Sequence, residues 1–145
     1  MGAPIEKGEI QRLLIEACPS FAGSDELREF VESGFDDLPY LLAGAFIRHL
    51  VTLNVQGRRE EFGAVFDLFE RLHTEGDPYV LNLATVGFLE DLGNGNMHRG
   101  GSKPSDFEKY LRPKSRWWWE ELELLWAGKI PYLGGSGRPR PKASG

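Results

Sequence analysis

The sequence predicts an all-α fold: a compact bundle of about six or seven helices, or a short array of helix hairpins. Leucine occurs 19 times, whereas valine and isoleucine together occur 11 times, so residues that favour strands are scarce. Apolar residues recur at spacings of three and four, and no segment alternates apolar with polar residues as a half-buried strand does. The 145 residues fit one domain, which we place at residues 1–128.

The first two predicted helices are short and have clear limits. One spans Glu9–Ala17, where an apolar stripe ends before Pro19. The next begins after Ser24, a residue type that caps helix N-termini. It ends at Ser33, because the following Gly34 suits the left-handed conformation that often terminates a helix.

The middle of the chain predicts three longer helices. The first spans Leu38–Gln56, with Asp36 or Asp37 as its N-cap. The second spans Arg59–Glu75 and the third spans Pro78–Leu92. The third is apolar on nearly every side, which is typical of a central, buried helix. We therefore expect a core that buries Phe46, Phe66, Leu81 and Phe88.

The last third of the chain predicts a loop, two helices and a tail. Residues 93–104 are rich in Gly and Asn and read as a surface loop. A short helix follows over Asp106–Leu111, capped by Ser105, and a final helix over Arg116–Ala127, capped by Ser115. Residues 129–145 contain four basic and no acidic residues among many Gly and Pro, which predicts a flexible tail.

Charge is distributed unevenly along the chain. The net charge is −5, and residues 1–92 hold 17 Asp and Glu against 7 Lys and Arg. This acidic body lacks the cations that neutralise phosphates, so we expect no nucleic-acid partner and a basic protein partner instead. The sequence shows no export signal and no apolar stretch of membrane-spanning length. We therefore expect a cytoplasmic protein with no membrane partner.

Sequence patterns for catalysis, cofactors and metals are missing. Glu70 and His73 form one Glu-x-x-His motif, whereas a di-iron bundle needs two such motifs and further carboxylates. Cys18 has no second cysteine to pair with, and the loop 93–101 lacks the Gly-Lys-Ser/Thr ending of a phosphate-binding loop. His49 lies on an apolar helix face, where a hydrogen-bonded core histidine is the commoner role. We expect no catalytic, cofactor-binding or metal-binding residue.

One face of the second predicted helix is acidic. At spacings of four, three and four it carries Asp25, Glu29, Glu32 and Asp36. Like charges at this spacing destabilise an isolated helix by about 0.2–0.5 kcal/mol per pair. Leu27, Phe30 and Val31 lie opposite and are expected to face the core. Two interpretations stay open: the acids form a solvated helix face, or, together with Asp37, they bind a basic partner.

The run Trp117-Trp118-Trp119 is the most unusual feature of the sequence. At 100° per residue, one core-facing arc carries Trp118, Trp119, Leu122, Leu125 and Trp126. Trp117 and Leu124 point to the other side, so we interpret them as partner-binding residues, since exposed tryptophan often anchors an interface. The alternative is that Trp117 packs against Phe107, Tyr110 or the tail.

Three segments carry a resemblance to a known group of proteins: FIRHLVTL (46–53), ERLHTEGDPYVLNLATVGFLEDL (70–92) and YLRPKSRWWWEEL (110–122). Over residues 38–127 the chain resembles a family of small all-helical bacterial proteins, mostly uncharacterised. Some members are immunity-type proteins encoded beside polymorphic toxins. The chain has Arg112 where this family usually has Gly before the proline. The matching residues are caps and core positions, so the resemblance implies the fold and carries over no catalytic residue.

Three hypotheses for function follow. The first is a non-catalytic binding protein of immunity type, which neutralises a cognate toxin through its acidic face. The second is a small enzyme with a polar site around His49, Glu70, His73 and Glu90. The third is a regulatory or scaffold module that uses Trp117 and the tail.

Overall fold

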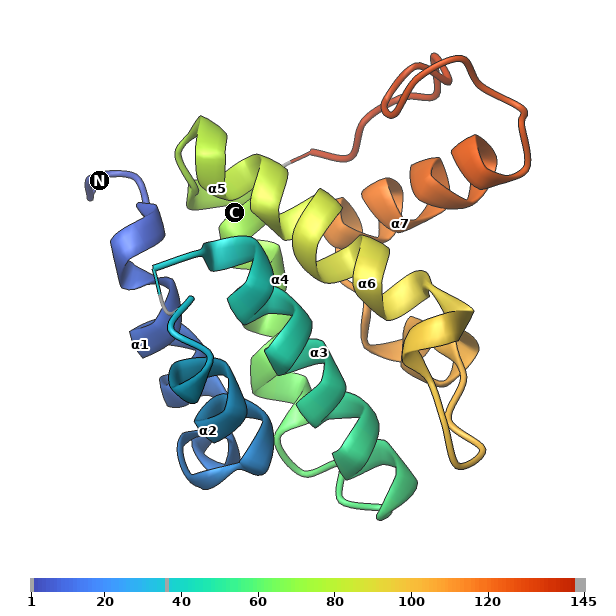
Figure 1. Ribbon diagram of the computed structural model, residues 1–145. Coiled ribbons are helices and arrows are strands. Elements are labelled where there is room, and N and C mark those ends of the chain that lie inside the picture. The colour runs from blue at the N-terminus through green and yellow to red at the C-terminus, as the bar shows by residue number, and fades with distance from the viewer. Residues whose placement is uncertain (1, 36, 143–145) are drawn as a thin grey trace.

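The computed structural model describes residues 2–35 and 37–142, and these contain seven α-helices (Figure 1). In chain order they are α1 (Ile10–Ala17), α2 (Asp25–Glu32), α3 (Pro39–Val55), α4 (Phe62–Glu75), α5 (Pro78–Asn82), α6 (Glu90–Gly93) and α7 (Pro113–Trp126). A π-helical segment, Leu83–Leu89, joins α5 to α6, and short 3₁₀ turns occur at Lys7–Glu9, Pro19–Gly23, Gly95–Met97 and Pro104–Tyr110. The predicted all-α class is therefore confirmed.

The helices form layers around α3 and α4. In Figure 1, α1 and α2 lie on one side of this pair, and the α5–α6 segment and α7 lie on the other. The centre of the core is aromatic: the Phe46 ring of α3 meets Phe21, Phe69 and Phe88 edge-on, at centroid distances of 5.0, 6.2 and 6.0 Å. Such edge-to-face pairs are favourable beyond the apolar area they bury. The core thus connects every layer.

The predicted burial is confirmed for Phe46, Phe66 and Phe88 and wrong for Leu81, which is 39% exposed. The expected single helix Pro78–Leu92 contains the π-helical segment, and Leu81 precedes it, facing a pocket between α5, α7 and the tail. Within the segment, Gly87 allows close packing on α3, because a Cβ there would lie 3.4 Å from that of Ala43.

Several helix starts differ from the sequence prediction. Ser24 does cap α2, since its Oγ accepts from Leu27 N at 3.1 Å. The N-cap of α3, however, is Leu38, without a side-chain hydrogen bond, and not Asp37; Asp36 lies outside the described residues. Of the other starts, α4 begins at Phe62 and not at Arg59.

The start of α7 is also earlier than expected. Pro113 opens this helix instead of ending the preceding turn, because proline is pre-organised for the first helical position. Ser115 is then the third residue of the helix, and its Oγ accepts from Arg112 N at 3.0 Å. Ser105 likewise lies within a turn that begins at Pro104, where Asp106 and not Ser105 accepts from Lys103 N.

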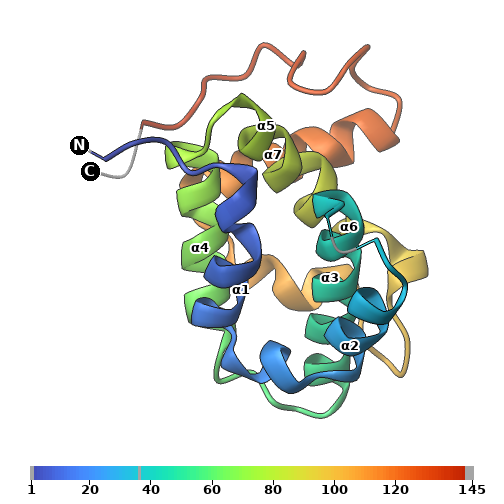
Figure 2. The same ribbon diagram turned by 60° about the vertical axis from the view of Figure 1, so that its left-hand side comes forward.

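The tail from residue 129 to 142 turns back and runs along α7 (Figure 2). Sequence reasoning found no residue that could anchor it. Arg138 is such a residue, because it donates to Glu121 Oε2 at 2.9 Å, Glu120 Oε1 at 2.9 Å and Trp117 O at 3.0 Å. No helix in the described part of the chain is both long enough and apolar enough to cross a membrane.

Candidate functional site

The acidic stripe is on the surface, as both of its interpretations require. Asp25, Glu29 and Glu32 of α2 and Asp37 of the α2–α3 connection are all exposed. Asp25 pairs with Arg28 at 2.9 Å, an exposed contact between residues three apart that adds little stability. Asp36 cannot be placed, since it lies outside the described residues. The described acids therefore present negative charge to solvent.

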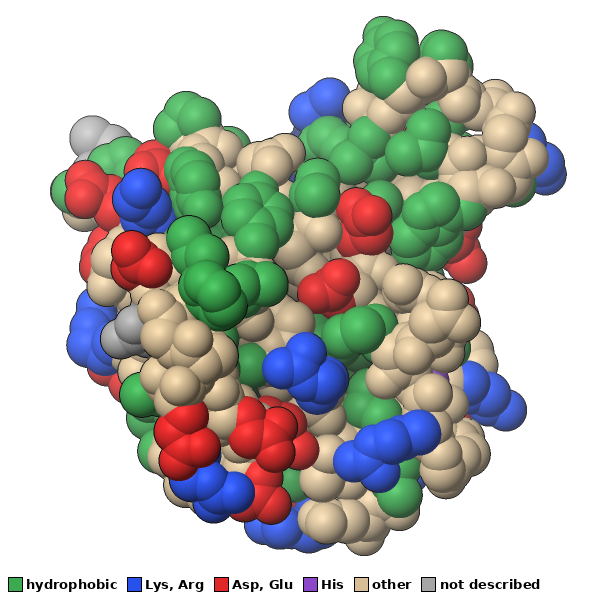
Figure 3. Space-filling view, viewed as in Figure 1, with side chains coloured by type: hydrophobic (Ala, Val, Ile, Leu, Met, Phe, Trp, Pro, Cys, Tyr) green, Lys and Arg blue, Asp and Glu red, His purple; other side chains and the backbone are tan. Residues whose placement is uncertain are grey.

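An apolar patch lies beside these acids, and the sequence analysis did not find it. We define it as the exposed side chains Val31, Phe35, Leu38, Leu41 and Tyr79, which are 48, 53, 43, 47 and 37% exposed. A contact between the Tyr40 and Tyr79 rings, with centroids 5.9 Å apart, links the start of α3 to α5. Figure 3 shows hydrophobic side chains gathered there, with acidic side chains below them over α2.

Sequence reasoning missed the patch because it expected Val31 to face the core, and because the spacing of Leu38 and Leu41 places them on the apolar face of the predicted helix Leu38–Gln56. Leu27 and Phe30 of α2 are buried as expected, but Val31 lies to one side of that stripe. Leu38 is the N-cap of α3 and Leu41 lies in its first turn, and no other element of the described chain covers them. A helical-wheel pattern gives the side on which a residue lies but not whether a neighbouring helix reaches that far along the axis.

Trp117 is buried, at 6% exposed, which corrects the expectation of an exposed anchor. The tail covers it: Nε1 donates to Pro139 O at 2.9 Å, and the guanidinium groups of Arg138 and Arg140 lie 5.2 and 4.9 Å from the ring. This is the alternative in which Trp117 packs against the tail. Leu124 is half-buried.

The rest of the tryptophan helix also departs from the predicted arc. Trp119 and Leu122 are buried as expected, whereas Trp126 is 49% exposed near the end of α7. Glu121 is fully buried, and the tail residues Ser136 and Arg138 bond to its carboxylate. Burial alone would raise the pKa of Glu121, but hydrogen bonds from Ser136 and Arg138 outweigh it and leave that pKa below its ordinary value. The tail, and not another helix, therefore covers this side of α7.

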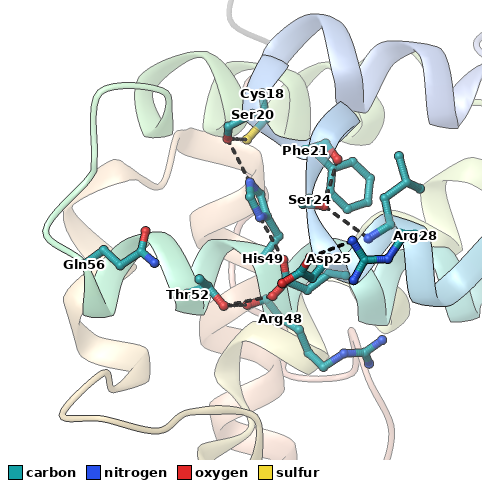
Figure 4. A network of polar contacts seen from close by, with 12 residues as sticks. Cys18, Ser20, Phe21, Ser24, Asp25, Arg28, Arg48, His49, Thr52 and Gln56 are labelled. Carbon is teal, nitrogen blue, oxygen red and sulfur yellow. Dashed lines mark hydrogen bonds and ion pairs between the residues drawn. The ribbon is translucent and has the colours of Figure 1, made fainter.

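A polar network surrounds His49 (Figure 4). Its Nε2 lies 2.8 Å from Ser20 Oγ, and its Nδ1 lies 3.1 Å from Glu26 Oε1. Thr52 donates to the other oxygen of Glu26 at 3.0 Å. Hydroxyl, imidazole and carboxylate in this order are the parts of a serine hydrolase triad. The positions of the protons decide whether the serine is activated.

The Ser20 proton is directed away from His49. Ser20 Oγ lies 2.5 Å from Glu61 Oε2, and Ser20 N donates to Glu61 Oε1 at 2.9 Å. Burial works to raise the pKa of Glu61, but the two hydrogen bonds from Ser20 outweigh it and lower that pKa, so Glu61 is an ionised acceptor. Ser20 has a single hydroxyl proton and donates it to Glu61, so this proton is not directed at His49 Nε2 as it is in a serine hydrolase triad. The network joins the α1–α2 turn, α2, α3 and α4, and this favours a structural role.

The four residues of the enzyme hypothesis do not form one site, although Glu70 and His73 are neighbours on α4. Glu70 accepts from the backbone N–H groups of Lys114 and Ser115, both at 2.9 Å, at the start of α7. His73 contacts Phe69 O at 2.7 Å and Thr85 Oγ1 at 2.9 Å. Glu90 lies beside the Gly93–Gly95 turn and Trp126. The hydrogen bonds of Glu70 and His73 involve no residue of the His49 network.

Titratable groups with the largest pKa shifts are also dispersed. Burial raises the pKa of Cys18 to about 11 at the end of α1, lowers that of His73 to about 4 on α4, and raises that of Asp91 to about 6 on α6. An active site usually brings such groups together in one cleft. Within residues 2–35 and 37–142, no group of three or more His, Cys, Asp or Glu side chains is placed to hold a metal ion.

Comparison with known proteins gives one finding. A family model described as a domain of unknown function (DUF7674) matches residues 12–127. No curated protein and no solved structure matches the chain. The match shows the family and the part of the chain that the family covers, and it contains no information on a link to toxins.

Proposed function

The chain belongs to the DUF7674 family, and from its own surface we propose that it is a non-catalytic binding protein for a basic protein partner. The observation that carries this proposal is the apolar patch together with the acids beside it. The immunity-type role suggested by the sequence resemblance makes the partner a cognate toxin. We expect the protein to act in the cytoplasm, without nucleic acid or membrane.

The apolar patch has the character of an interface centre. Large apolar side chains that are exposed as a group, with polar residues around them, are typical of protein–protein contact sites. Phe35 is the most exposed of the five and the largest of those that are wholly apolar, so it is the best candidate for the residue that fills a partner pocket. Tyr79 adds a hydroxyl-bearing ring, a residue type enriched at interfaces.

The charges beside the patch select the kind of partner. Asp25, Glu29, Glu32 and Asp37 are exposed there, and on α2 only Arg28 opposes them. A partner with Lys and Arg around an apolar centre would match this arrangement, because interfaces commonly combine an apolar core with a polar rim. Complementary rim charges act mainly on the association rate and on specificity.

The chemistry of the interior supports a role without catalysis. In the His49 network the serine donates to Glu61, and Glu70 bonds to the backbone of α7. These polar groups are therefore used to hold helices together. A protein that neutralises a toxin by covering its active surface needs a stable scaffold and an exposed patch, and it needs no reactive group of its own.

The test uses the product of the adjacent reading frame as the partner. The purified protein should bind that product in a surface-binding assay and suppress its activity. Phe35→Ser should raise the dissociation rate about tenfold or more, as expected for an interface anchor. Tyr132→Ser is the matched control, because Tyr132 is 65% exposed but lies in the tail, so its kinetics should not change.

A second pair of variants tests the charges. Glu29→Lys should lower the association rate about threefold at low salt and weaken its dependence on salt. Glu60→Lys makes the same change at an exposed position outside the stripe and should have a smaller effect. Equal kinetics for the Phe35 and Glu29 variants and wild type would refute this surface as the interface. Hydrolytic activity of the protein itself, abolished by His49→Ala, would refute the non-catalytic role.

A further inference from the structure

A pocket of about 520 Å³ lies between α5, the start of α7 and the tail, and none of the five side chains of the apolar patch lines it. This volume is in the range typical of small-molecule sites. Most of its wall is apolar and consists of Pro78, Leu81, Trp117, Trp118, Leu133 and Pro141. Neither the proposed function nor the polar network around His49 uses it.

Two cations line this pocket, and no carboxylate of residues 2–35 or 37–142 does. Within the described part of the chain, the ammonium group of Lys114 and the guanidinium group of Arg140 make no ion pair and no hydrogen bond. The nearby carboxylate of Glu70 is occupied by the backbone N–H groups at the start of α7. The pocket is therefore locally positive in a protein whose net charge is −5.

The remaining polar groups of the pocket are neutral. Burial lowers the pKa of His73 to about 4, so its ring is uncharged at neutral pH. His73 Nδ1 then donates to Phe69 O, and Nε2 accepts from Thr85. Asn82 donates to the Tyr40 hydroxyl. Lys114 and Arg140 are thus the groups with free charge.

The tail completes the pocket and places one of its cations. Leu133, Arg140 and Pro141 belong to the tail, and the Arg140 guanidinium lies 4.9 Å from the Trp117 ring centroid and 5.2 Å from that of Trp118. The guanidinium group is attracted by the face of each of the two indole rings, and its N–H groups can still donate to an anion. Indole walls suit a flat apolar body, and paired cations suit a carboxylate.

We propose that this pocket binds a small organic anion: a flat, apolar molecule whose carboxylate lies between Lys114 and Arg140. The ligand body contacts the indole rings and Leu81. Its carboxylate supplies the negative charge that neither cation meets within the described part of the chain. Because the protein as a whole is acidic, long-range attraction does not bring the anion in, and recognition depends on short-range contacts in the pocket. The inference does not depend on the proposed partner.

The experiment titrates the full chain with 2-naphthoate and follows tryptophan fluorescence and heat release. Its neutral analogue, 2-naphthylmethanol, has a similar ring and no charge. We expect saturable binding of the acid at least about tenfold tighter than that of the alcohol, since a hydrogen-bonded charge contributes more than a neutral group. Failure of the acid to saturate by about 1 mM, or equal affinity for acid and alcohol, would overturn the proposal.

Two variants locate the anion in the pocket. Lys114→Met keeps most of the apolar stem and removes the charge, so it should weaken naphthoate binding about five- to tenfold without changing that of the alcohol. Lys109→Met is the matched control, because Lys109 lies over the Tyr110 ring outside the pocket. Unchanged thermal melting of both variants shows that they fold. Equal naphthoate affinities for the two variants would place the anion elsewhere and refute the assignment.

Discussion

Replacing Glu70 by alanine should destabilise α7 selectively. The carboxylate of Glu70 is 7% exposed and accepts from Lys114 N and Ser115 N, both at 2.9 Å. It thus caps the N-terminus of α7 from α4, where a negative charge also interacts favourably with the helix dipole. Glu70→Ala leaves two backbone donors without a partner, and Ser115 is fully buried.

The magnitude follows from these two donors. An unsatisfied buried N–H costs about 1–3 kcal/mol, and the half-buried Lys114 N–H will cost less than that of Ser115 because water can reach it. We expect a loss of about 2–4 kcal/mol in the free energy of unfolding. For a chain of this length that corresponds to a decrease in Tm of roughly 5–12 °C. Glu70→Gln keeps one acceptor oxygen and should lose about half as much.

The assay can assign the loss to α7, because all four tryptophans of the sequence lie on that helix. Thermal unfolding is followed by tryptophan fluorescence, which reports on α7, and by far-ultraviolet circular dichroism, which reports on all helices. In Glu70→Ala the fluorescence transition should precede the dichroism transition, whereas in the wild type the two should coincide.

Glu75→Ala is the matched control for this experiment. Glu75 lies on the same helix, but it is exposed, and its ion pair within the described chain is with Arg71 at 3.4 Å, so its removal should change Tm by about 1 °C or less. A decrease in Tm for Glu70→Ala no larger than that for Glu75→Ala would refute the reasoning. So would a loss that appears equally in both signals.

Two further predictions concern buried titratable groups. Since burial lowers the pKa of His73 to about 4 from an unfolded value near 6.5, the unfolded chain binds its proton first, and stability should fall as the pH falls from about 6.5 to 4. The loss in the free energy of unfolding totals roughly 3 kcal/mol. Measured by urea unfolding, this free energy should decline less steeply with falling pH in His73→Gln than in the wild type, and equal slopes for the two proteins would contradict the prediction. Burial raises the pKa of the fully buried Cys18 thiol to about 11, so dithiobis-nitrobenzoate at pH 8 should label it only upon unfolding, and rapid labelling of the native protein would be the opposite result.

The sequence predicts the helical scaffold well because the relevant forces are local. Apolar spacing identified the helices, and Ser24 identified the start of α2. The prediction of helix limits failed where a helix end depends on residues that are distant in the sequence. The start of α7 is stabilised by Glu70, which lies more than forty residues earlier in the chain, so a search for a neighbouring cap chose Ser115 instead. The π-helical segment within the predicted Pro78–Leu92 helix likewise left no local signal that we recognised.

The position of the tail on α7 also could not be predicted from local sequence. After Leu133 it has no large apolar residue, so hydrophobicity gave no reason to expect contact with the body. Its contact depends on Arg138, which meets Glu120, Glu121 and Trp117. Each of these was visible in the sequence as a charge or an aromatic ring, but their proximity is a property of the folded chain. The predicted role of Trp117 as an anchor failed for this reason.

Of the candidate interface, the acidic residues could be predicted from the sequence and the apolar patch could not. Acidic spacing on α2 could be read directly, because charge repeats follow the helix. The apolar patch could not, because Val31, Leu38 and Leu41 have the spacing of core residues and are exposed where no element of the described chain packs over them. Leaving Phe35 and its neighbours uncovered lowers the stability of the isolated chain, since their burial would be favourable. A partner that covers them would recover this free energy, so the patch is the surface at which binding can contribute most.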